Sequence, residues 1–148
     1  MVRPIGLACL DVTEWHFPLF ASYISAGFPS PADDYLESHL DLNRYLIHQP
    51  TATFFMRFEG DPMIDSGLRH GDLLIVDRSI PPTDNKIVVA AFNGDLIVRR
   101  VQTKGRYMHL LSENPNCPTL SISKDTEFEI WGVVTYFIHD LLRSGRSL

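Results

Sequence analysis

The chain has 148 residues, of which 45% are hydrophobic, and it carries a formal net charge of −5 at pH 7. This size fits one domain with a sizeable core and some residues left over for an arm or tail. The acidic balance argues against direct DNA binding, because neutralisation of phosphates supplies most non-specific affinity. No apolar run is long enough to cross a bilayer, and Asp11 and Glu14 make the N-terminal segment a poor signal peptide. We therefore expect a cytoplasmic protein with no membrane contact. Any role on DNA would run through a protein partner.

The cysteines and histidines do not indicate a metal or redox site. Cys9 and Cys117 lack the spacing of metal ligands, and we expect both to be free thiols. The 6 histidines show no paired metal-ligand spacing either. The sequence therefore predicts no metal and no other cofactor.

Residues 1–40 are expected to form an extended N-terminal arm. Aromatic residues are frequent there, but Pro18, Pro29 and Pro31 would interrupt a helix or a central strand. The segment 25–29, Ser-Ala-Gly-Phe-Pro, is small and extended. It is of the kind that threads a narrow protease cleft, although an ordinary linker limited by prolines is the simpler interpretation of these residues.

The pattern after the arm is helical. Leu36 and Leu40 would fall on one face of a helix, Asp41 is a plausible N-cap, and Pro50 would stop the helix. We predict one short helix over 41–48. Its expected role is structural, as a bridge between the arm and the body.

The remainder, within a predicted domain of residues 41–148, reads as β structure. Strands are predicted over 53–59, 73–77, 86–92, 95–102, 106–112 and 127–138. Asn93-Gly94 is the strongest hairpin signal, because a type I′ turn needs positive φ at both central residues. The frequent turns predict a mainly β fold with a twisted, partly closed core.

Alternation within the strands predicts which side chains are buried. The predicted core contains Phe54, Met56, Phe58, Leu74, Val76, Val88, Ala90, Ile97, Leu110, Ile130, Val133 and Phe137.

The stretch 58–77, FEGDPMIDSGLRHGDLLIVD, is the most distinctive in the chain. Gly-Asp turns and a polar turn through Asp65, Ser66 and Gly67 surround only a few apolar residues. Such a stretch would place one exposed side chain at the mouth of a β core.

Several pieces of sequence together resemble the self-cleaving proteins typified by UmuD and the LexA repressor. They are Phe17-Pro18-Leu19-Phe20, Gly27-Phe28-Pro29-Ser30-Pro31-Ala32, Asp41-Leu42-Asn43, Gly60-Asp61 followed by Met63-Ile64-Asp65, residues 71–77, and Gly132-Val133-Val134. The resemblance covers about residues 17–141. It implies a LexA/UmuD-type β core with a Ser/Lys dyad, self-cleavage of the arm stimulated by RecA filaments after DNA damage, and service to a translesion polymerase.

Both dyad positions differ from the family pattern. The position of the attacking serine holds Pro62, and alignment through Gly94, Val98 and Gln102 places Arg99 where the family has its lysine base. Proline has no hydroxyl. A guanidinium stays protonated and has no acceptor, so it cannot take a proton. The family's cleaved bond aligns with Ala26-Gly27.

These observations lead to a hypothesis of a pseudo-protease. It would be a UmuD-like subunit, a homodimer or a heterodimer with an active UmuD-type subunit, which binds a Y-family polymerase or a RecA filament without cutting itself. A LexA-like fragment that serves only dimerisation is a further possibility.

An active hydrolase with a relocated nucleophile is the main alternative. It would use Ser66, with His70 or His109 as base, although a serine between Asp and Gly more often makes a turn. A basic patch of Arg99, Arg100, Lys104 and Arg106 is also possible, against the simpler reading of a solvated hairpin.

Overall fold

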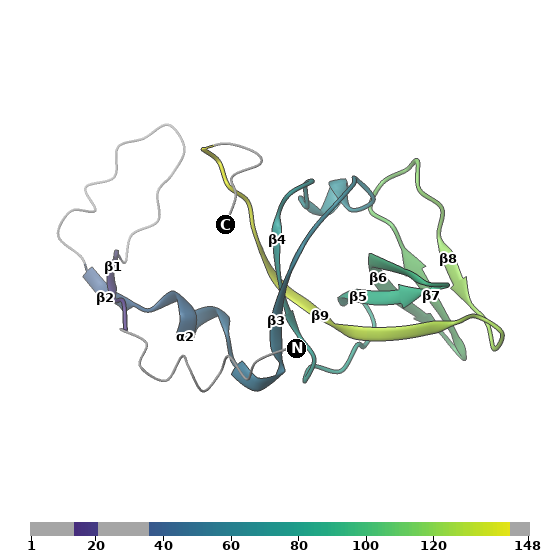
Figure 1. Ribbon diagram of the computed structural model, residues 1–148, viewed down its shortest axis with the longest axis horizontal. Helices are drawn as coiled ribbons and strands as arrows, with labels where there is room; N and C mark the ends of the chain where they lie inside the picture. Colours follow the sequence, from purple (N-terminus) through teal and green to yellow (C-terminus); the bar gives the residue numbers. More distant parts are fainter. Residues whose placement is uncertain (1–13, 21–35, 143–148) are drawn as a thin grey trace. The chain divides into compact units, whose positions relative to one another are not determined.

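The structure is a computed structural model that describes residues 14–20 and 36–142. The chain divides into two compact units, Met1–Thr51 and Ala52–Leu148 (Figure 1). The predictions that concern Cys9, Ala26 and Gly27 fall on residues 1–13 and 21–35, which lie outside the described residues. The predicted border between arm and core stays a prediction.

The first unit contains a two-stranded sheet and a short helix. Strand β1 (Phe17–Phe20) pairs antiparallel with β2 (Leu36–Leu40), and Pro18 faces His39. Both strands of such a sheet are edges, where a proline is tolerated. The prediction that Leu36 and Leu40 share a helical face is therefore wrong, because backbone pairing with β1 keeps both residues extended.

The predicted short helix is confirmed, although it is shorter than expected. Helix α2 runs over Leu42–Leu46, and the Asp41 side chain accepts a hydrogen bond of 3.0 Å from the Asn43 N–H. That bond is the N-cap expected from the sequence. The helix ends at Ile47, and Pro50 begins the 3-10 turn η3 (Pro50–Ala52), which leads into the second unit.

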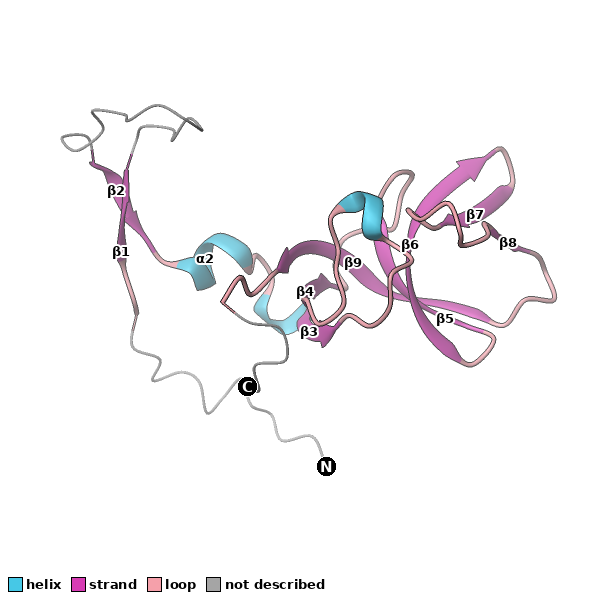
Figure 2. Ribbon diagram, turned by 90° about the horizontal axis from the view of Figure 1, so that it is seen from above, coloured by secondary structure: helices cyan, strands magenta, loops and turns pink. Residues whose placement is uncertain are grey.

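The second unit is built on one 7-stranded antiparallel sheet with the order β3-β4-β9-β5-β6-β7-β8 (Figure 2). Its strands are β3 (Thr53–Arg57), β4 (Leu73–Asp77), β5 (Ile87–Phe92), β6 (Asp95–Lys104), β7 (Tyr107–Leu111), β8 (Leu120–Ile122) and β9 (Phe128–Ile138). The mainly β fold predicted from the sequence is confirmed. Strand β8 was not predicted, because three residues are too few to show alternation.

Strand β6 is paired differently on its two sides. Its pairing with β5 extends from Asp95 to Arg100, whereas its pairing with β7 begins only at Arg100. The β5–β6 turn has φ of 48° at Asn93 and 90° at Gly94, as the type I′ prediction requires. The first half of β6 therefore continues beyond the end of β7.

The core of the second unit consists of two clusters. The first contains Phe58, Met63, Leu68, Leu74, Val76, Val89 and Val98, and the second contains Val88, Ala90, Val101, Leu110 and Val133. The predicted core residues are buried or packed against these clusters, except Phe137, whose side chain is 40% exposed. The burial of Met63 and Leu68 was not predicted.

Gly132 allows β9 to pass close to β4, and we expect Gly132→Ala to destabilise the protein. An added Cβ would lie 2.7 Å from Cγ1 of Val76 and 3.2 Å from the carbonyl oxygen of Asp77. Overpacking of this kind costs about 1–3 kcal/mol of unfolding free energy, measurable by urea denaturation. The penalty should be smaller in a Val76→Ala background, where Cγ1 is absent. Equal penalties in both backgrounds would contradict a clash with Val76.

Candidate functional site

Backbone hydrogen bonds join the two ends of the loop that carries Pro62, and two buried side chains attach the loop to the core. The Phe58 N–H donates to the Asp72 carbonyl at 2.9 Å, and the Gly71 N–H donates to the Phe58 carbonyl at 2.7 Å. Within the loop, Met63 is 0% exposed and Leu68 is 1% exposed. These two side chains fix the loop to the core, so that Pro62 is held at its edge.

Glu113 and Asn114, which follow β7, form hydrogen bonds with the backbone carbonyl groups of Asp61 and Pro62. The Glu113 N–H donates to the Pro62 carbonyl at 2.7 Å, and Asn114 Nδ2 donates to the Asp61 carbonyl at 2.9 Å. The Asp65 N–H in turn donates to the Glu113 carbonyl at 2.7 Å. We call Glu113 and Asn114 the loop clamp. None of its bonds involves the side chain at position 62.

The loop clamp was missed in the sequence. Glu113 and Asn114 lie just before Pro115 in a segment with no strand periodicity, so the segment reads as an ordinary loop. The burial of Asn114, whose side chain is only 9% exposed, follows from contacts across the fold. No local signal could have identified these two residues.

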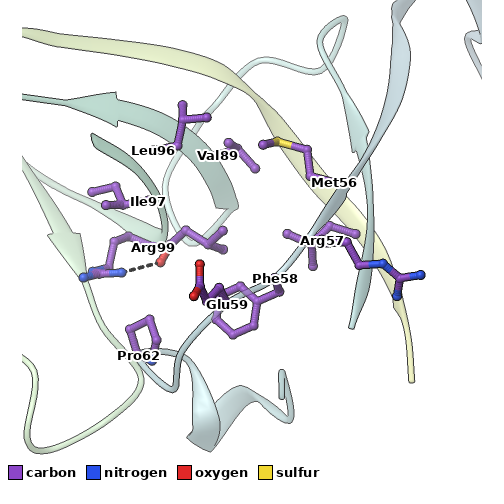
Figure 3. A pocket seen from close by; sticks show the side chains of 11 residues that line it. Met56, Arg57, Phe58, Glu59, Pro62, Val89, Leu96, Ile97 and Arg99 are labelled. Carbon is purple, nitrogen blue, oxygen red and sulfur yellow. Dashed lines mark hydrogen bonds between the residues drawn. The ribbon is translucent and has the colours of Figure 1, made fainter. Parts of the chain in front are cut away.

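Pro62 and Arg99 line the same cavity, which has a volume of about 470 Å³. Figure 3 shows the Pro62 ring and the Arg99 side chain on the same side of this cavity. The remaining lining residues are mainly apolar, and they are Met56, Arg57, Phe58, Glu59, Leu74, Val89, Leu96, Ile97 and Val98. The structure thus brings together the two positions that the sequence comparison paired.

Arg99 is half-buried and only partly satisfied. Its Nη1 donates to the Val98 carbonyl at 2.8 Å, whereas its Nε is the one buried side-chain nitrogen or oxygen of the described residues that lacks a hydrogen-bond partner. Burial lowers the pKa of the guanidinium, and the nearby Cys117 opposes this effect. An arginine starts from so high a pKa that it still carries its charge.

The four residues of the possible basic patch lie in different surroundings. Arg100 forms an ion pair with Glu113 and donates from Nη1 to the Asn85 carbonyl at 2.7 Å. Lys104 and Arg106 are exposed at the turn between β6 and β7. The ion pair of Arg100 therefore connects the strand that carries Arg99 to the loop clamp.

The residues of the relocated-nucleophile alternative are engaged in local bonds. The Ser66 hydroxyl donates to the Met63 carbonyl at 2.7 Å, as expected of a turn serine. His70 Nδ1 accepts from the Gly60 N–H at 3.2 Å, and His109 Nδ1 lies 3.0 Å from the Ser121 hydroxyl. Neither histidine is bonded to Ser66 in these contacts.

Within residues 14–20 and 36–142, no group of three or more His, Cys, Asp or Glu side chains could hold a metal ion. Cys117 is a free thiol. In the part of the chain that the structure describes, no helix is long and apolar enough to span a membrane.

Comparison with known proteins gives the family. The profile described as Peptidase S24-like matches residues 18–135. Protein SamA of Salmonella typhimurium strain LT2 is 50% identical over 122 residues, which cover 82% of this chain and 84% of SamA. Protein ImpA of Escherichia coli is 45% identical over 123 residues, covering 82% and 83% of the two chains. Protein MucA of Escherichia coli is 41% identical over 120 residues, covering 80% and 82%.

The chain belongs to the peptidase S24-like family. Within that family it is a UmuD-like member of the LexA/UmuD group, because its relatives SamA, ImpA and MucA are UmuD-like. The role of these UmuD-like family members is related to SOS mutagenesis.

Proposed function

We propose that this protein is a UmuD-like accessory subunit of translesion DNA synthesis in the SOS response and that it does not cleave itself. It acts in the cytoplasm as a homodimer or as a heterodimer with an active UmuD-type subunit. Its partners are a RecA filament, a Y-family polymerase, or both. It does not bind DNA directly, in line with its net charge of −5.

The single observation that carries this proposal is the chemistry of the cavity. Attack on an amide needs a nucleophile and a nearby base that takes its proton. Pro62 and Arg99 line the cavity, but one has no hydroxyl and the other is a permanent cation without an acceptor. Pro62 also has no N–H to donate to an oxyanion. The site can hold a peptide without cutting it.

Exposed aromatic side chains in the first unit support a role in protein binding. Trp15 is 66% exposed, Phe17 57% and Phe20 53%. None of the residues whose side chains are described in this unit is buried. Such a surface is typical of a segment that docks on another protein.

The test is to follow the mass of the purified chain in the presence of RecA-nucleoprotein filaments. Alone, the chain should remain intact. Mixed with an active family member, it should be cut in trans at Ala26-Gly27. Release of residues 1–26 without the active relative would contradict the proposal.

Two controls make an absence of cleavage meaningful. The same filaments must cleave the active relative when it is incubated by itself. The chain must also show a cooperative unfolding transition under the assay conditions, so that loss of structure is not mistaken for loss of activity.

A further inference from the structure

The cavity beside Pro62 carries one acidic and one basic side chain that do not neutralise each other. Glu59 and Arg99 both line this cavity. Within residues 14–20 and 36–142, neither of the two side chains takes part in an ion pair. The cavity wall therefore presents a negative and a positive charge at separate points.

The guanidinium of Arg99 has donors that the described residues do not use. Its Nη1 donates to the Val98 carbonyl at 2.8 Å, and its Nε is buried without a partner. A guanidinium has five N–H donors, and its planar shape matches a carboxylate, which can accept two parallel N–H bonds. Removing a charge from water is unfavourable unless the charge is paired and hydrogen-bonded. A ligand carboxylate would offset this cost.

Glu59 offers the opposite charge to a ligand. Figure 3 shows its carboxylate pointing into the cavity. Its backbone is held from both sides, because Phe58 is only 4% exposed and the Gly60 N–H donates to Nδ1 of His70 at 3.2 Å. The carboxylate itself accepts no hydrogen bond from the part of the chain that the structure describes. It is therefore available to an ammonium group.

The rest of the cavity is mainly apolar and lies within one unit of the chain. Its wall includes the side chains of Met56, Phe58, Leu96 and Ile97, and all lining residues belong to the second unit. Its volume of about 470 Å³ lies within the range of about 300–1,000 Å³ that is typical of small-molecule sites. The cavity is thus suited to a molecule that combines a carboxylate, an ammonium group and an apolar part.

We propose that this cavity binds a free α-amino acid with an apolar side chain. Arg99 binds the carboxylate of the ligand, Glu59 binds its ammonium group, and the apolar wall contacts its side chain. A free amino acid carries both charges next to the carbon atom that bears the side chain. A peptide instead carries its terminal charges at opposite ends, so the free amino acid fits two charges on one wall better.

The two charged contacts should differ in strength. Arg99 is half-buried, and charge-assisted hydrogen bonds are about twice as strong as neutral ones. Glu59 is exposed, and an exposed ion pair contributes little because water and salt screen it. The carboxylate of the ligand should therefore contribute more to its affinity than the ammonium group.

The test is a titration of the whole ¹⁵N-labelled protein with L-leucine, followed by NMR through the backbone amide signals. Signals of Glu59, Val98 and Arg99 should shift saturably, whereas that of Gly105 should not. L-leucinamide, which lacks the carboxylate, should bind about tenfold more weakly. N-acetyl-L-leucine, which lacks the ammonium charge, should bind about threefold more weakly. An absence of saturable shifts with L-leucine, or equal affinities for the three compounds, would overturn the inference.

Protein variants assign each charge of the ligand to its residue. In Arg99→Gln the preference for L-leucine over L-leucinamide should disappear, and in Glu59→Gln the preference over N-acetyl-L-leucine should disappear. Arg106→Gln and Glu127→Gln, which change exposed residues of the same types, should keep both preferences. A preference that survives loss of its assigned residue, or that vanishes in a control, would overturn the assignment. Thermal unfolding would show that each variant is folded, and the ligand series on the unmodified chain needs no variant.

Two further compounds test the apolar wall and the size of the ligand. Glycine keeps both charges without a side chain, and it should bind about tenfold more weakly than L-leucine, since burying a leucine side chain is worth about 1.5–3 kcal/mol. The dipeptide L-leucyl-L-leucine should also bind more weakly. Equal or tighter binding of either compound would overturn the inference. These titrations follow the binding of small molecules, so their failure would leave the mass test of the proposed function unaffected.

Discussion

A variant with both Pro62→Ser and Arg99→Lys should cut its own chain between Ala26 and Gly27, while the unmodified chain stays intact. The loop clamp holds the carbonyls of Asp61 and Pro62, so an introduced serine enters a loop that is already positioned. The introduced lysine supplies a base that can lose its proton. Mass spectrometry over a range of pH would measure the cleavage.

The pH dependence has a definite sign. A lysine amine accepts the serine proton only when it is neutral, and its ordinary pKa is about 10.4. Burial lowers the pKa of a lysine, because it disfavours the charged form. Cleavage should therefore be slow in acid and rise with pH through the pKa of the introduced lysine. A rate that falls with rising pH would exclude lysine as the base.

The single variants are the matched controls. Pro62→Ser alone has a hydroxyl beside a guanidinium that cannot accept its proton, and Arg99→Lys alone has an amine without a nucleophile. Both should remain uncut. Cleavage by Pro62→Ser alone would indicate another base, and a folded but inactive double variant would show that more than these two side chains was lost.

Met63→Ala should lower the free energy of unfolding by about 2–5 kcal/mol, the usual cost of truncating a buried Met, Leu or Ile to alanine. Met63 is 0% exposed and packs in the first core cluster. The neighbouring Ile64 is 42% exposed, so Ile64→Ala is the matched control and should cost less than about 1 kcal/mol. Urea denaturation would measure both. Equal losses would contradict the anchoring role of Met63.

The sequence was most informative where local chemistry determines the backbone. Leu73–Asp77 is an apolar run after a Gly-Asp turn, and the structure has β4 over the same residues. Asn93-Gly94 adopts the positive φ angles that its residue types favour. Asp41 caps its helix because a short carboxylate reaches the backbone N–H two residues on. Each of these features is determined within a few residues.

The features that were missed depend on contacts between distant segments. Leu36 and Leu40 have helical spacing, but pairing with β1 overrides it. The loop clamp joins residues 113–114 to a loop about fifty positions earlier, and nothing in either segment indicates the other. The family resemblance did predict that Pro62 and Arg99 belong to one site. Only the structure shows that Nε of Arg99 is buried without a hydrogen-bond partner.

The hydrogen bond from Arg99 to the Val98 carbonyl has a consequence for solubility. β7 pairs with β6 only from Arg100 onward, so the preceding residues of β6 could act as a template for a strand from another molecule. The arginine side chain already occupies an acceptor on this stretch and places a positive charge beside it. Charged side chains at strand edges discourage aggregation. Arg99 would thus protect the protein from self-association at this strand.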